Sequence, residues 1–424
     1  MKKFLLLLIL ALSSCESTLD RSEILQSFKK ETQEPYKPHS QFESRDLGTD
    51  KSLQKKVQVA LFLPFSGKNK ELGWSLLNAA SMSIFDNDLT HNIELVLIDS
   101  KDSETEARKA FLKIVESNIK IVIGPIFSQT VESIEDLAKK HGITVISFSN
   151  NRELMDKTNS EGGVFLAGIA PETQVDRIVG YALSQGKSSF SIIAPKNQYG
   201  TAITALFKRM VKGRDGVFVT SEFYDQNSKD LDRVVNHTIN AFVISPNSKK
   251  TKKDVIAESD RTYSQIIMIP ESGEILSKIV AEIKAQNTDE RNFQIVGTNQ
   301  WDDTSTFSDY NLIGGWFAAP ENEKFRDFEK AYYQNYSKFP PRIASISYDM
   351  VAAVSKLIDL KKGQTPSIAD FTSSILSSNN GFSGIDGMFR FIPNGLVQRN
   401  LAVLRIGNNR FETIEKPTEK FLQY

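Results

Sequence analysis

The sequence predicts an α/β fold made of two doubly wound lobes, each built on a mainly parallel sheet. Between Val57 and Phe148, short unbroken apolar runs alternate with segments of helical periodicity, and the same alternation starts again at Val164. Strands that are apolar on both faces and are separated by helices of about 10–15 residues are typical of a parallel sheet covered on both sides. Two such units in tandem predict a hinge and a ligand cleft, because ligands bind outside the carboxyl ends of parallel strands.

The elements of the first lobe follow from periodicity. Val57–Leu63 is apolar at every position except Gln58 and predicts a buried strand, and the apolar residues of 72–85 recur at helical spacing. The further elements expected in this lobe are strands at 93–99, 121–123 and 144–148 and helices at 104–115 and 128–140.

The second lobe repeats this pattern. Its expected strands are 164–166, 190–194, 217–223, 241–245, 265–269 and 293–296, with helices at 172–184, 201–211 and 274–285. The loops at the carboxyl ends of strands become the candidate ligand loops. They are Pro64–Gly67, Gly124–Ser128, Ser147–Asn151 and Pro195–Gly200.

The amino terminus has the composition of an export signal. Two lysines precede the apolar run from Phe4 to Leu12, which is too short to span a bilayer, so residues 1–14 are expected to be removed as a signal peptide. Two serines then precede Cys15, the only cysteine of the chain. This arrangement resembles the lipobox of bacterial lipoproteins, in which the thiol is acylated. The alternative is an ordinary signal peptide with a chance cysteine.

Residues 15–56 are expected to be a lipidated N-terminus and a disordered tether. The segment is rich in Ser, Glu, Lys, Gln and Asp, and its few apolar residues follow neither a helical nor a strand period. About forty such residues span roughly 35 Å on average. We therefore expect a folded module that is held on a membrane through its N-terminal lipid and faces the periplasm.

The composition excludes several classes of protein. The chain has 52 Lys and Arg against 52 Asp and Glu, so no basic field is present to bind nucleic acid. No second cysteine is available for a disulfide or a thiolate metal site, and none of the four histidines stands in a His-Glu-x-x-His motif. The segment from Gly180 to Ser188 nearly spells a P-loop, but its glycines are separated by five residues instead of four. We therefore predict no enzyme, no catalytic residue, no metal and no cofactor.

A family resemblance rests on motifs spread from Val57 to about Ile406. They are Leu63-Pro64-Phe65-Ser66-Gly67, Leu97-Ile98-Asp99, Ile123-Gly124-Pro125-Ile126-Phe127-Ser128, Ile146-Ser147-Phe148-Ser149, Tyr199-Gly200, Tyr348-Asp349 and the hairpin Gly384–Gly395. In this order they resemble the type I periplasmic-binding fold of the leucine/isoleucine/valine-binding proteins. The lipobox, the first motif and Gly314–Pro320 also resemble lipoproteins known as penicillin-binding-protein activators.

The resemblance implies domain boundaries. Lobe 1 is expected at 57–168 plus 299–385, lobe 2 at 169–298 plus 386–412, and a C-terminal tail at 413–424, with three crossovers serving as the hinge.

The resemblance also implies a ligand site. In amino-acid binders of this family, hydroxyls and backbone N–H groups of lobe 1 hold the ligand carboxylate, while an aromatic residue and an acid of lobe 2 complete the site. The matching positions are Ser66, Ser128, Phe148, Ser149, Asn150, Tyr199 and Glu271. Ser128 could also act as the N-cap of the following helix.

Two functions follow from the two resemblances. The leading interpretation is a membrane-anchored regulator that activates peptidoglycan synthesis by binding a synthase, a penicillin-binding protein. The alternative is the solute receptor of an amino-acid ABC importer of the branched-chain type, with an ABC permease as partner and an amino-acid-like ligand. Both place the protein in the bacterial cell envelope, and Glu16 after the cysteine favours the outer membrane.

Overall fold

Two sheets, the first parallel and the second mainly parallel, organise the part of the chain that the structure describes. The structure is a computed structural model and describes residues 56–88, 92–157, 163–225, 229–244, 259, 261–287, 292–367, 370, 381–392, 394–418 and 421. Residues Leu53–Tyr424 form one compact unit. The signal peptide, Cys15 and the tether lie outside the described residues.

The first sheet has five parallel strands in the order β2-β1-β3-β4-β5. The strands are β1 (Val57–Leu63), β2 (Ile93–Asp99), β3 (Ile121–Ile123), β4 (Thr144–Ser147) and β5 (Val164–Leu166). The helices connected to them are α2 (Lys70–Asn87), α3 (Glu104–Glu116), α4 (Ser128–His141) and α5 (Glu153–Lys157). All five strands fall at expected positions, but β5, which was expected to begin the second sheet, is the last strand of the first sheet and pairs with β4.

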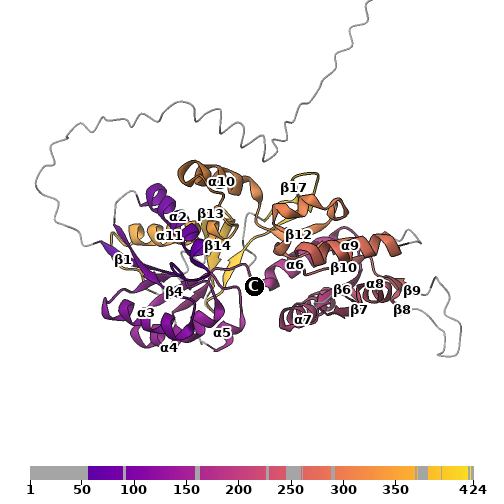
Figure 1. Ribbon diagram of the computed structural model, residues 1–424, viewed down its shortest axis with the longest axis horizontal. Helices are drawn as coiled ribbons and strands as arrows, with labels where there is room; N and C mark the ends of the chain where they lie inside the picture. Colours follow the sequence, from indigo (N-terminus) through magenta and orange to yellow (C-terminus); the bar gives the residue numbers. More distant parts are fainter. Residues whose placement is uncertain are drawn as a thin grey trace, which may run out of the picture. The chain divides into compact units, whose positions relative to one another are not determined.

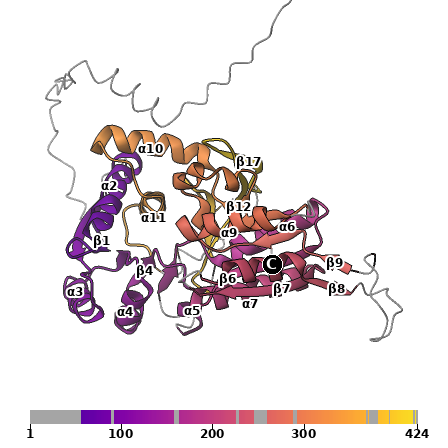
Figure 2. The ribbon, with the colours of Figure 1, turned by 45° about the vertical axis from the view of Figure 1, so that its right-hand side comes forward.

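Helices cover both faces of this sheet, as Figures 1 and 2 show: α2, α10 (Asn322–Tyr336) and α11 (Ala344–Leu360) lie on one side, and α3 and α4 lie on the other. Side chains of β1 alternate between the two resulting cores. Leu61 joins the core under α2 and α11, whereas Phe62 joins the core under α3 and α4. This alternation explains why the strand is apolar at almost every position.

The second sheet has seven strands in the order β17-β16-β12-β11-β10-β6-β7. They are β6 (Ser189–Pro195), β7 (Val217–Tyr224), β10 (Ile266–Met268), β11 (Gln294–Gly297), β12 (Trp316–Ala319), β16 (Ala402–Ile406) and β17 (Phe411–Glu415). Its helices are α6 (Pro171–Ser184), α7 (Gln198–Gly213), α8 (Leu231–Asn240) and α9 (Gly273–Gln286), with 3-10 turns η2 (Asn299–Trp301), η3 (Thr304–Ser308) and η4 (Tyr310–Leu312). The first two helices share one core, and α8 and α9 share another on the opposite face.

Two small antiparallel sheets complete the fold. One consists of β13 (Phe382–Gly384), β14 (Gly387–Phe391) and β15 (Val397–Arg399), and the other of β8 (Phe242–Ile244) and β9 (Arg261–Tyr263). The hairpin expected at Gly384–Gly395 is present, with Gly384 paired to Gly387 across a two-residue turn. The strand expected at 241–245 pairs with β9 instead of extending the second sheet.

The sheet order differs from the expected domain boundaries. Strand β12 pairs with β11 in the second sheet, and Trp301 and Leu312 belong to a lobe 2 core, so lobe 2 continues to about Ala319 rather than ending at residue 298. Phe389 and Phe391 of β14 belong to the lobe 1 core, so lobe 1 continues past residue 385. The tail expected from residue 413 still contains part of β17. The reason in each case is an apolar strand that continues a sheet beyond the expected boundary.

Three connections join the lobes: β5 to α6, β12 to α10, and β15 to β16. Gly168 lies in the first connection, where an added Cβ would come 2.6 Å from the carbonyl oxygen of Phe148. Among the described residues, no helix is long and apolar enough to span a membrane.

Candidate functional site

The carboxyl end of the first sheet presents a connected group of serine hydroxyls. Ser128 begins α4 after the short loop that follows β3, and its Oγ lies 2.9 Å from the Oγ of Ser149, which follows β4. Ser149 is buried; its Oγ accepts from the Asn151 N–H at 3.1 Å, and its own N–H donates to the Oγ of Ser147 at 3.0 Å. The two predicted lobe 1 hydroxyls therefore meet at one point.

Ser128 does not cap its helix. The N-cap position is Phe127, which makes no side-chain capping bond, and Ser128 is the first helical residue. The free N–H groups in the first turn of a helix carry a partial positive charge and attract anions. Hydroxyls and a helix N-terminus at the same place form a neutral, donor-rich surface suited to a carboxylate.

Gly124 fixes the chain between β3 and this helix. Its φ is +102°, and an added Cβ would lie 2.2 Å from the carbonyl oxygen of Phe62. Only glycine fits such a close approach to a neighbouring strand. The loop that carries Ser128 is thus held against β1.

Phe148 and Asn150 line a cavity of about 290 Å³ at the connections between the lobes. Its other lining residues include Gly168, Asn299, Asp302, Arg342 and Asp386. Phe148 is buried, so it contributes an apolar wall, while Asn150 is exposed and contributes an amide. The cavity thus joins two predicted residues to charged groups that sequence reasoning missed.

Ser66 lies apart from these hydroxyls in the loop after β1. It accepts a hydrogen bond from Lys101 Nζ at 3.1 Å, and the same ammonium lies 2.8 Å from Asp99. Burial raises the pKa of Asp99, but hydrogen bonds from Lys101, from the Ser66 hydroxyl and from the Phe65 N–H outweigh this effect and lower the pKa to about 2. The predicted residue therefore belongs to a small polar group of its own.

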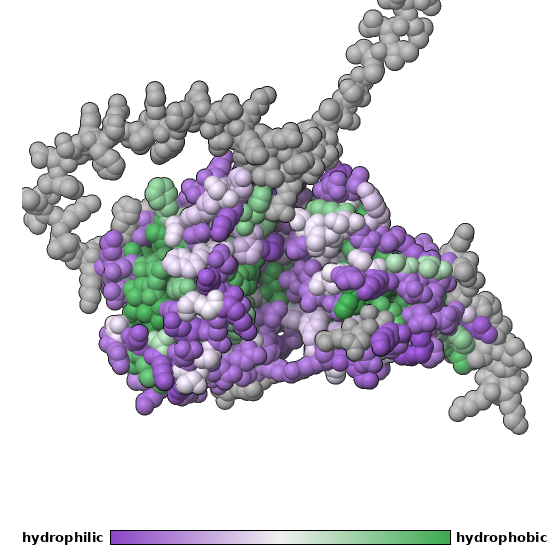
Figure 3. Space-filling model, viewed as in Figure 1, coloured by the Kyte–Doolittle hydropathy of each residue, from purple (hydrophilic) through white to green (hydrophobic). Residues whose placement is uncertain are grey.

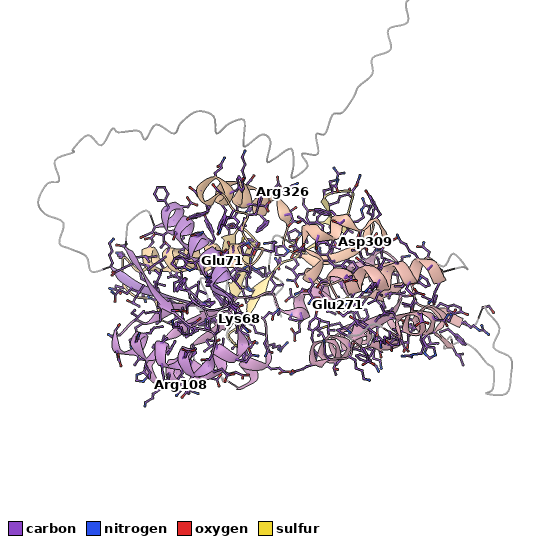
Figure 4. The ribbon with its side chains drawn as sticks, in the orientation of Figure 1. Lys68, Glu71, Arg108, Glu271, Asp309 and Arg326 are labelled. Atoms are coloured by element: carbon purple, nitrogen blue, oxygen red, sulfur yellow. The ribbon has the colours of Figure 1, made fainter. Side chains whose placement is uncertain are left out.

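The carboxyl end of the second sheet carries a carboxylate and two phenols. Glu271 follows β10 and precedes α9, where Figure 4 labels it. Its Oε2 accepts a short hydrogen bond from the hydroxyl of Tyr224, the last residue of β7, and its Oε1 accepts from the Ser272 N–H at 3.0 Å. Burial and the bond to Glu271 raise the pKa of Tyr224 well above its usual range.

Tyr199 stands beside this carboxylate at the start of α7. Burial raises the pKa of its phenol, the nearby Thr298 hydroxyl lowers it, and the charge of Glu271 raises it further. The adjacent Gly200 is required because an added Cβ would lie 1.9 Å from the carbonyl oxygen of Pro195. Residues at the carboxyl ends of four strands, β6, β7, β10 and β11, thus come together around the Glu271 carboxylate.

Trp301 supports Glu271 from within the lobe. The indole is fully buried, and its Nε1–H donates to the backbone carbonyl of Glu271 at 3.0 Å. Gly297 lies flat against the ring, where a Cβ would come 2.2 Å from the indole. Trp316 packs against Tyr181 at 5.0 Å between ring centroids. Both tryptophans therefore serve packing.

A charged network lies at the lobe connections. Arg342, just before α11, pairs with Asp302 at 2.8 Å and with Asp386 at 2.6 Å, and its guanidinium stacks on Phe325 at 4.1 Å. Burial raises the pKa of Asp302. For Asp386, the positive charge of Arg342 outweighs burial and lowers the pKa. One arginine thus holds two segments from opposite sides of the connections.

A second buried ion pair lies behind the first, wholly inside lobe 1. Arg399 pairs with Asp349 at 3.2 Å, and the two side chains are 1% and 0% exposed. Asp349 also accepts from the Ile385 N–H at 2.7 Å. Burial raises the pKa of Asp349 to about 6, against the opposing effect of Arg399. Glycine at 384 leaves room for this carboxylate, since a Cβ there would lie 2.4 Å away.

A larger cavity of about 350 Å³ contains none of the predicted residues. It is lined by Arg152, Glu153, Glu172 and Arg209, and its one ion pair, Arg152 to Glu172, spans 3.8 Å. Exposed pairs of this kind contribute little to stability or recognition. The converging hydroxyls, phenols and carboxylate at the sheet ends make the better candidate site.

The structure thus groups the predicted residues into two sets. Ser128, Phe148, Ser149 and Asn150 come together on lobe 1, Tyr199 and Glu271 come together on lobe 2, and Ser66 joins neither. Sequence reasoning missed Tyr224, whose place at a strand end was a usable signal, and Arg342, the one charge before a long apolar helix. Among the described residues no cluster of acids and histidines could hold a metal ion.

Comparisons with known proteins agree with this fold. The family model described as periplasmic binding protein matches residues 56–410. The chain is 25% identical over 376 residues to the uncharacterized protein RP748 of Rickettsia prowazekii (strain Madrid E), which covers 87% of this chain and 91% of that protein.

Solved structures show the same type I periplasmic-binding fold. A Rhodospirillum rubrum protein, provisionally described as a branched-chain amino acid ABC transporter, aligns with TM-score 0.71 and 16% identity over 85% of this chain and 100% of that one. The substrate-binding protein LivJ of Streptococcus pneumoniae, in complex with isoleucine, aligns with TM-score 0.57 and 18% identity over 85% of this chain and 100% of that one. A benzoate complex of a solute-binding protein from R. palustris aligns with TM-score 0.60 and 14% identity over 85% of this chain and 96% of that one.

Proposed function

Since the chain belongs to the periplasmic binding protein family, we propose that it is a solute receptor of the cell envelope that delivers a small amino-acid-like solute to an ABC permease. The observation that carries the proposal is the Glu271 carboxylate, held by Tyr224 and a backbone N–H at the carboxyl end of the second sheet. A carboxylate fixed in this way is a partner for an ammonium group.

The carboxyl end of the first sheet complements the Glu271 carboxylate. The hydroxyls of Ser128 and Ser149 and the N-terminus of α4 present donors, which suit the carboxylate of the same solute. An α-amino acid carries both groups on one carbon, so it would use both sheet ends at once. Tyr199 would stack on the bound solute from lobe 2. The match to proteins of amino acid importers supports this proposal, because it favours the receptor alternative over the regulator of peptidoglycan synthesis.

The regulator hypothesis has no comparable support. One of its sequence motifs, Gly314–Pro320, contains β12, whose Trp316 packs on Tyr181 and whose Phe317 is buried. These residues stabilise the second sheet and present no distinctive surface to a synthase. A penicillin-binding protein is thus not the leading partner, and a pull-down would test whether it binds.

Membrane attachment through Cys15 forms part of the proposal. Acyl chains on this residue would hold the receptor on the periplasmic side of a membrane, the outer one by preference. Cys15→Ser should release the protein into the soluble fraction, while retention after a high-salt wash would contradict lipidation.

The experiment that tests the solute class compares two ligands on two variants. Calorimetry would measure the affinities of the wild type and of Glu271→Gln for two kinds of ligand. The first kind is the branched-chain amino acids, and the second is benzoate, a carboxylate without an ammonium group. Glutamine keeps an acceptor for Tyr224 but removes the charge. We expect affinity for the amino acid to fall at least about tenfold, since a hydrogen bond to a charged group contributes about 1.5–3 kcal/mol.

Benzoate provides the internal control. Any benzoate affinity should be unchanged in Glu271→Gln, because that ligand has no ammonium group to lose. Equal losses for both ligands would contradict the assignment of Glu271 to the ammonium. Absence of binding by every amino acid tested would remove the receptor proposal itself.

A further inference from the structure

Lobe 1 exposes apolar side chains along its outer edge. Phe85 and Trp74 of α2 are 89% and 47% exposed, Leu97 of β2 is 46% exposed, and Leu112 of α3 is 40% exposed. Figure 3 shows hydrophobic surface gathered on the side of the molecule where β1 and α2 lie. We call these four residues the edge patch. Single exposed apolar residues are ordinary on a protein surface, whereas a gathered set of them marks an interaction site.

The edge patch surrounds a strand with one open side. β2 stands first in the sheet order and is hydrogen-bonded to β1 along its whole length, from Ile93 to Asp99. Its other side carries backbone N–H and C=O groups without a neighbouring strand in the described sheet. The strand contains no proline or lysine, and Glu94 is its one charge before Asp99. Such an open, apolar edge favours pairing with another strand.

The helix α2 adds a seam that suits another helix. Trp74, Leu77, Ser81 and Ile84 follow one another at spacings of three, four and three residues, the repeat by which two helices pack side by side. Ser81 is exposed and small, and Leu77 and Ile84 are half-buried against the lobe 1 core. The large side chains thus lie toward the ends of the seam, with a small one between them.

The helix on the opposite face has a complementary charge pattern. Lys109, Leu112 and Glu116 of α3 are exposed and share one face at spacings of three and four residues. A basic residue therefore lies on one side of Leu112 and an acidic residue on the other. Two such helices packed antiparallel about Leu112 would set each lysine opposite a glutamate, whereas a parallel pair would set like charges together.

We propose that the outer edge of lobe 1 binds a second copy of the same chain across a two-fold axis. The axis passes between the two β2 strands, level with the middle of each, so that they pair antiparallel and the two sheets become one. On one face Trp74 meets the Ile84 and Phe85 end of the partner's α2, and on the other Lys109 meets the partner's Glu116. This self-complementarity favours a second copy over an unrelated protein, which would have no reason to match all three elements.

The arrangement leaves the solute site open. The candidate site lies at the carboxyl ends of the strands, whereas the edge patch lies along the side of β2, so pairing covers neither Ser128 nor Glu271. Only lobe 1 takes part, and lobe 2 stays free to move about the three connections. The inference does not depend on which solute the protein binds.

Cross-linking of the full-length chain in detergent tests the axis. Ser81→Cys places a thiol near the predicted axis, and Ala202→Cys places one at an exposed position of α7 on lobe 2. The unsubstituted chain, whose one cysteine is Cys15, gives the background. A short bis-maleimide reagent should trap a dimer with Ser81→Cys and only background amounts with the other two chains. Equal trapping at both positions would overturn the proposal.

Light scattering with a disruptive substitution provides the second test. Leu97→Lys places a lysine of each copy at the symmetric contact, where the like charges repel each other, and it should raise the dimer dissociation constant at least about a hundredfold. Ile313→Lys is the matched control, because Ile313 is 41% exposed on lobe 2; it should leave the dimer unchanged. Melting curves check that both variants fold. A monomeric wild type, or a dimer that survives Leu97→Lys, would show that no second copy binds at this edge.

Discussion

The two lobes present opposite chemistry at equivalent places. At the carboxyl end of the first sheet stand hydroxyls and a helix N-terminus, with no acid among the predicted residues there. At the carboxyl end of the second stand the Glu271 carboxylate and the phenols of Tyr199 and Tyr224. A ligand that satisfies both ends must carry a negative group on one side and a positive group on the other. The difference between the lobes therefore supports the proposed zwitterionic solute better than either lobe does alone.

The lobes also differ in how they hold charge. Lobe 1 buries the Arg399–Asp349 ion pair completely, and Arg342 pairs with two aspartates beside it. Among the described residues of lobe 2, the buried polar ones are Gln174, serines and threonines, and none of them is charged. The stability of lobe 1 should thus be the more sensitive to losing an ionic partner.

The largest effect is expected for Arg399→Met. The change leaves the Asp349 carboxylate buried without its cation, which costs about 3–5 kcal/mol of unfolding free energy. Arg342→Met should cost less, because the side chain of Arg342 is 24% exposed whereas that of Arg399 is 1% exposed. Urea unfolding followed by circular dichroism measures both. Equal losses of unfolding free energy would show that the difference in burial between Arg399 and Arg342 does not determine the cost.

A smaller effect concerns pH. The pKa of Asp349 is raised from 3.8 to about 6, so between these values the folded state binds more protons than the unfolded state. Stability should therefore fall as pH rises through this window and level off above it. Asp99, with a pKa lowered to about 2, acts in the opposite direction and costs stability as pH falls from 3.8 toward 2. Melting temperatures across pH 2–7, repeated with Asp99→Asn, separate the two carboxylates.

The next effect in size is expected on ligand affinity, when one group is removed at the carboxyl end of each sheet. Ser128→Ala with Tyr199→Ala removes one group from each lobe and should weaken amino acid binding at least about tenfold, since 1.4 kcal/mol is a factor of ten. The effects should add, because the two groups contact different parts of the ligand. Calorimetry on the single and double variants tests this. A double variant no weaker than either single one would mean that the ligand contacts only one lobe.

A still smaller loss is expected for Tyr224→Phe. The phenol holds Glu271 in place, and its removal leaves the carboxylate with the Ser272 N–H as its one hydrogen-bond donor among the described residues. We expect a loss of a few fold, since a net hydrogen bond contributes about 0.5–1.5 kcal/mol. Benzoate should show no change. A loss as large as that of Glu271→Gln would mean that Tyr224 itself contacts the ligand.

Much of this architecture could be predicted from the sequence because the strands are buried on both faces. Runs such as Val57–Leu63 have no other stable placement, and the motif order gave the two-lobe topology. Local patterns carry less information about where a segment crosses between sheets. Trp316–Ala319 is as apolar as any lobe 1 strand, and only its pairing with β11 assigns it to lobe 2.

Part of the candidate site could also be predicted from the sequence. Residues at strand ends could be found because parallel strands bring their carboxyl ends to one edge, which is why Ser128 and Ser149 meet. Arg342, Asp302 and Asp386 could not be found in this way. They come from three distant segments, and no local spacing relates residues that meet only through the fold.

The smallest expected effect is at Ser66, the predicted residue that lies apart. Its hydroxyl accepts from Lys101, which is also paired with Asp99 in an exposed loop, so the alanine variant leaves the lysine with its stronger partner. Amino acid affinity of Ser66→Ala should stay within about twofold of the wild type, because surface substitutions of this kind change free energies by about 0.5 kcal/mol or less. Calorimetry beside Ser128→Ala gives the comparison under identical conditions. A loss as large as that of Ser128→Ala would extend the lobe 1 site to the loop after β1, and the donor surface would then include Lys101 as a positive charge for the solute carboxylate.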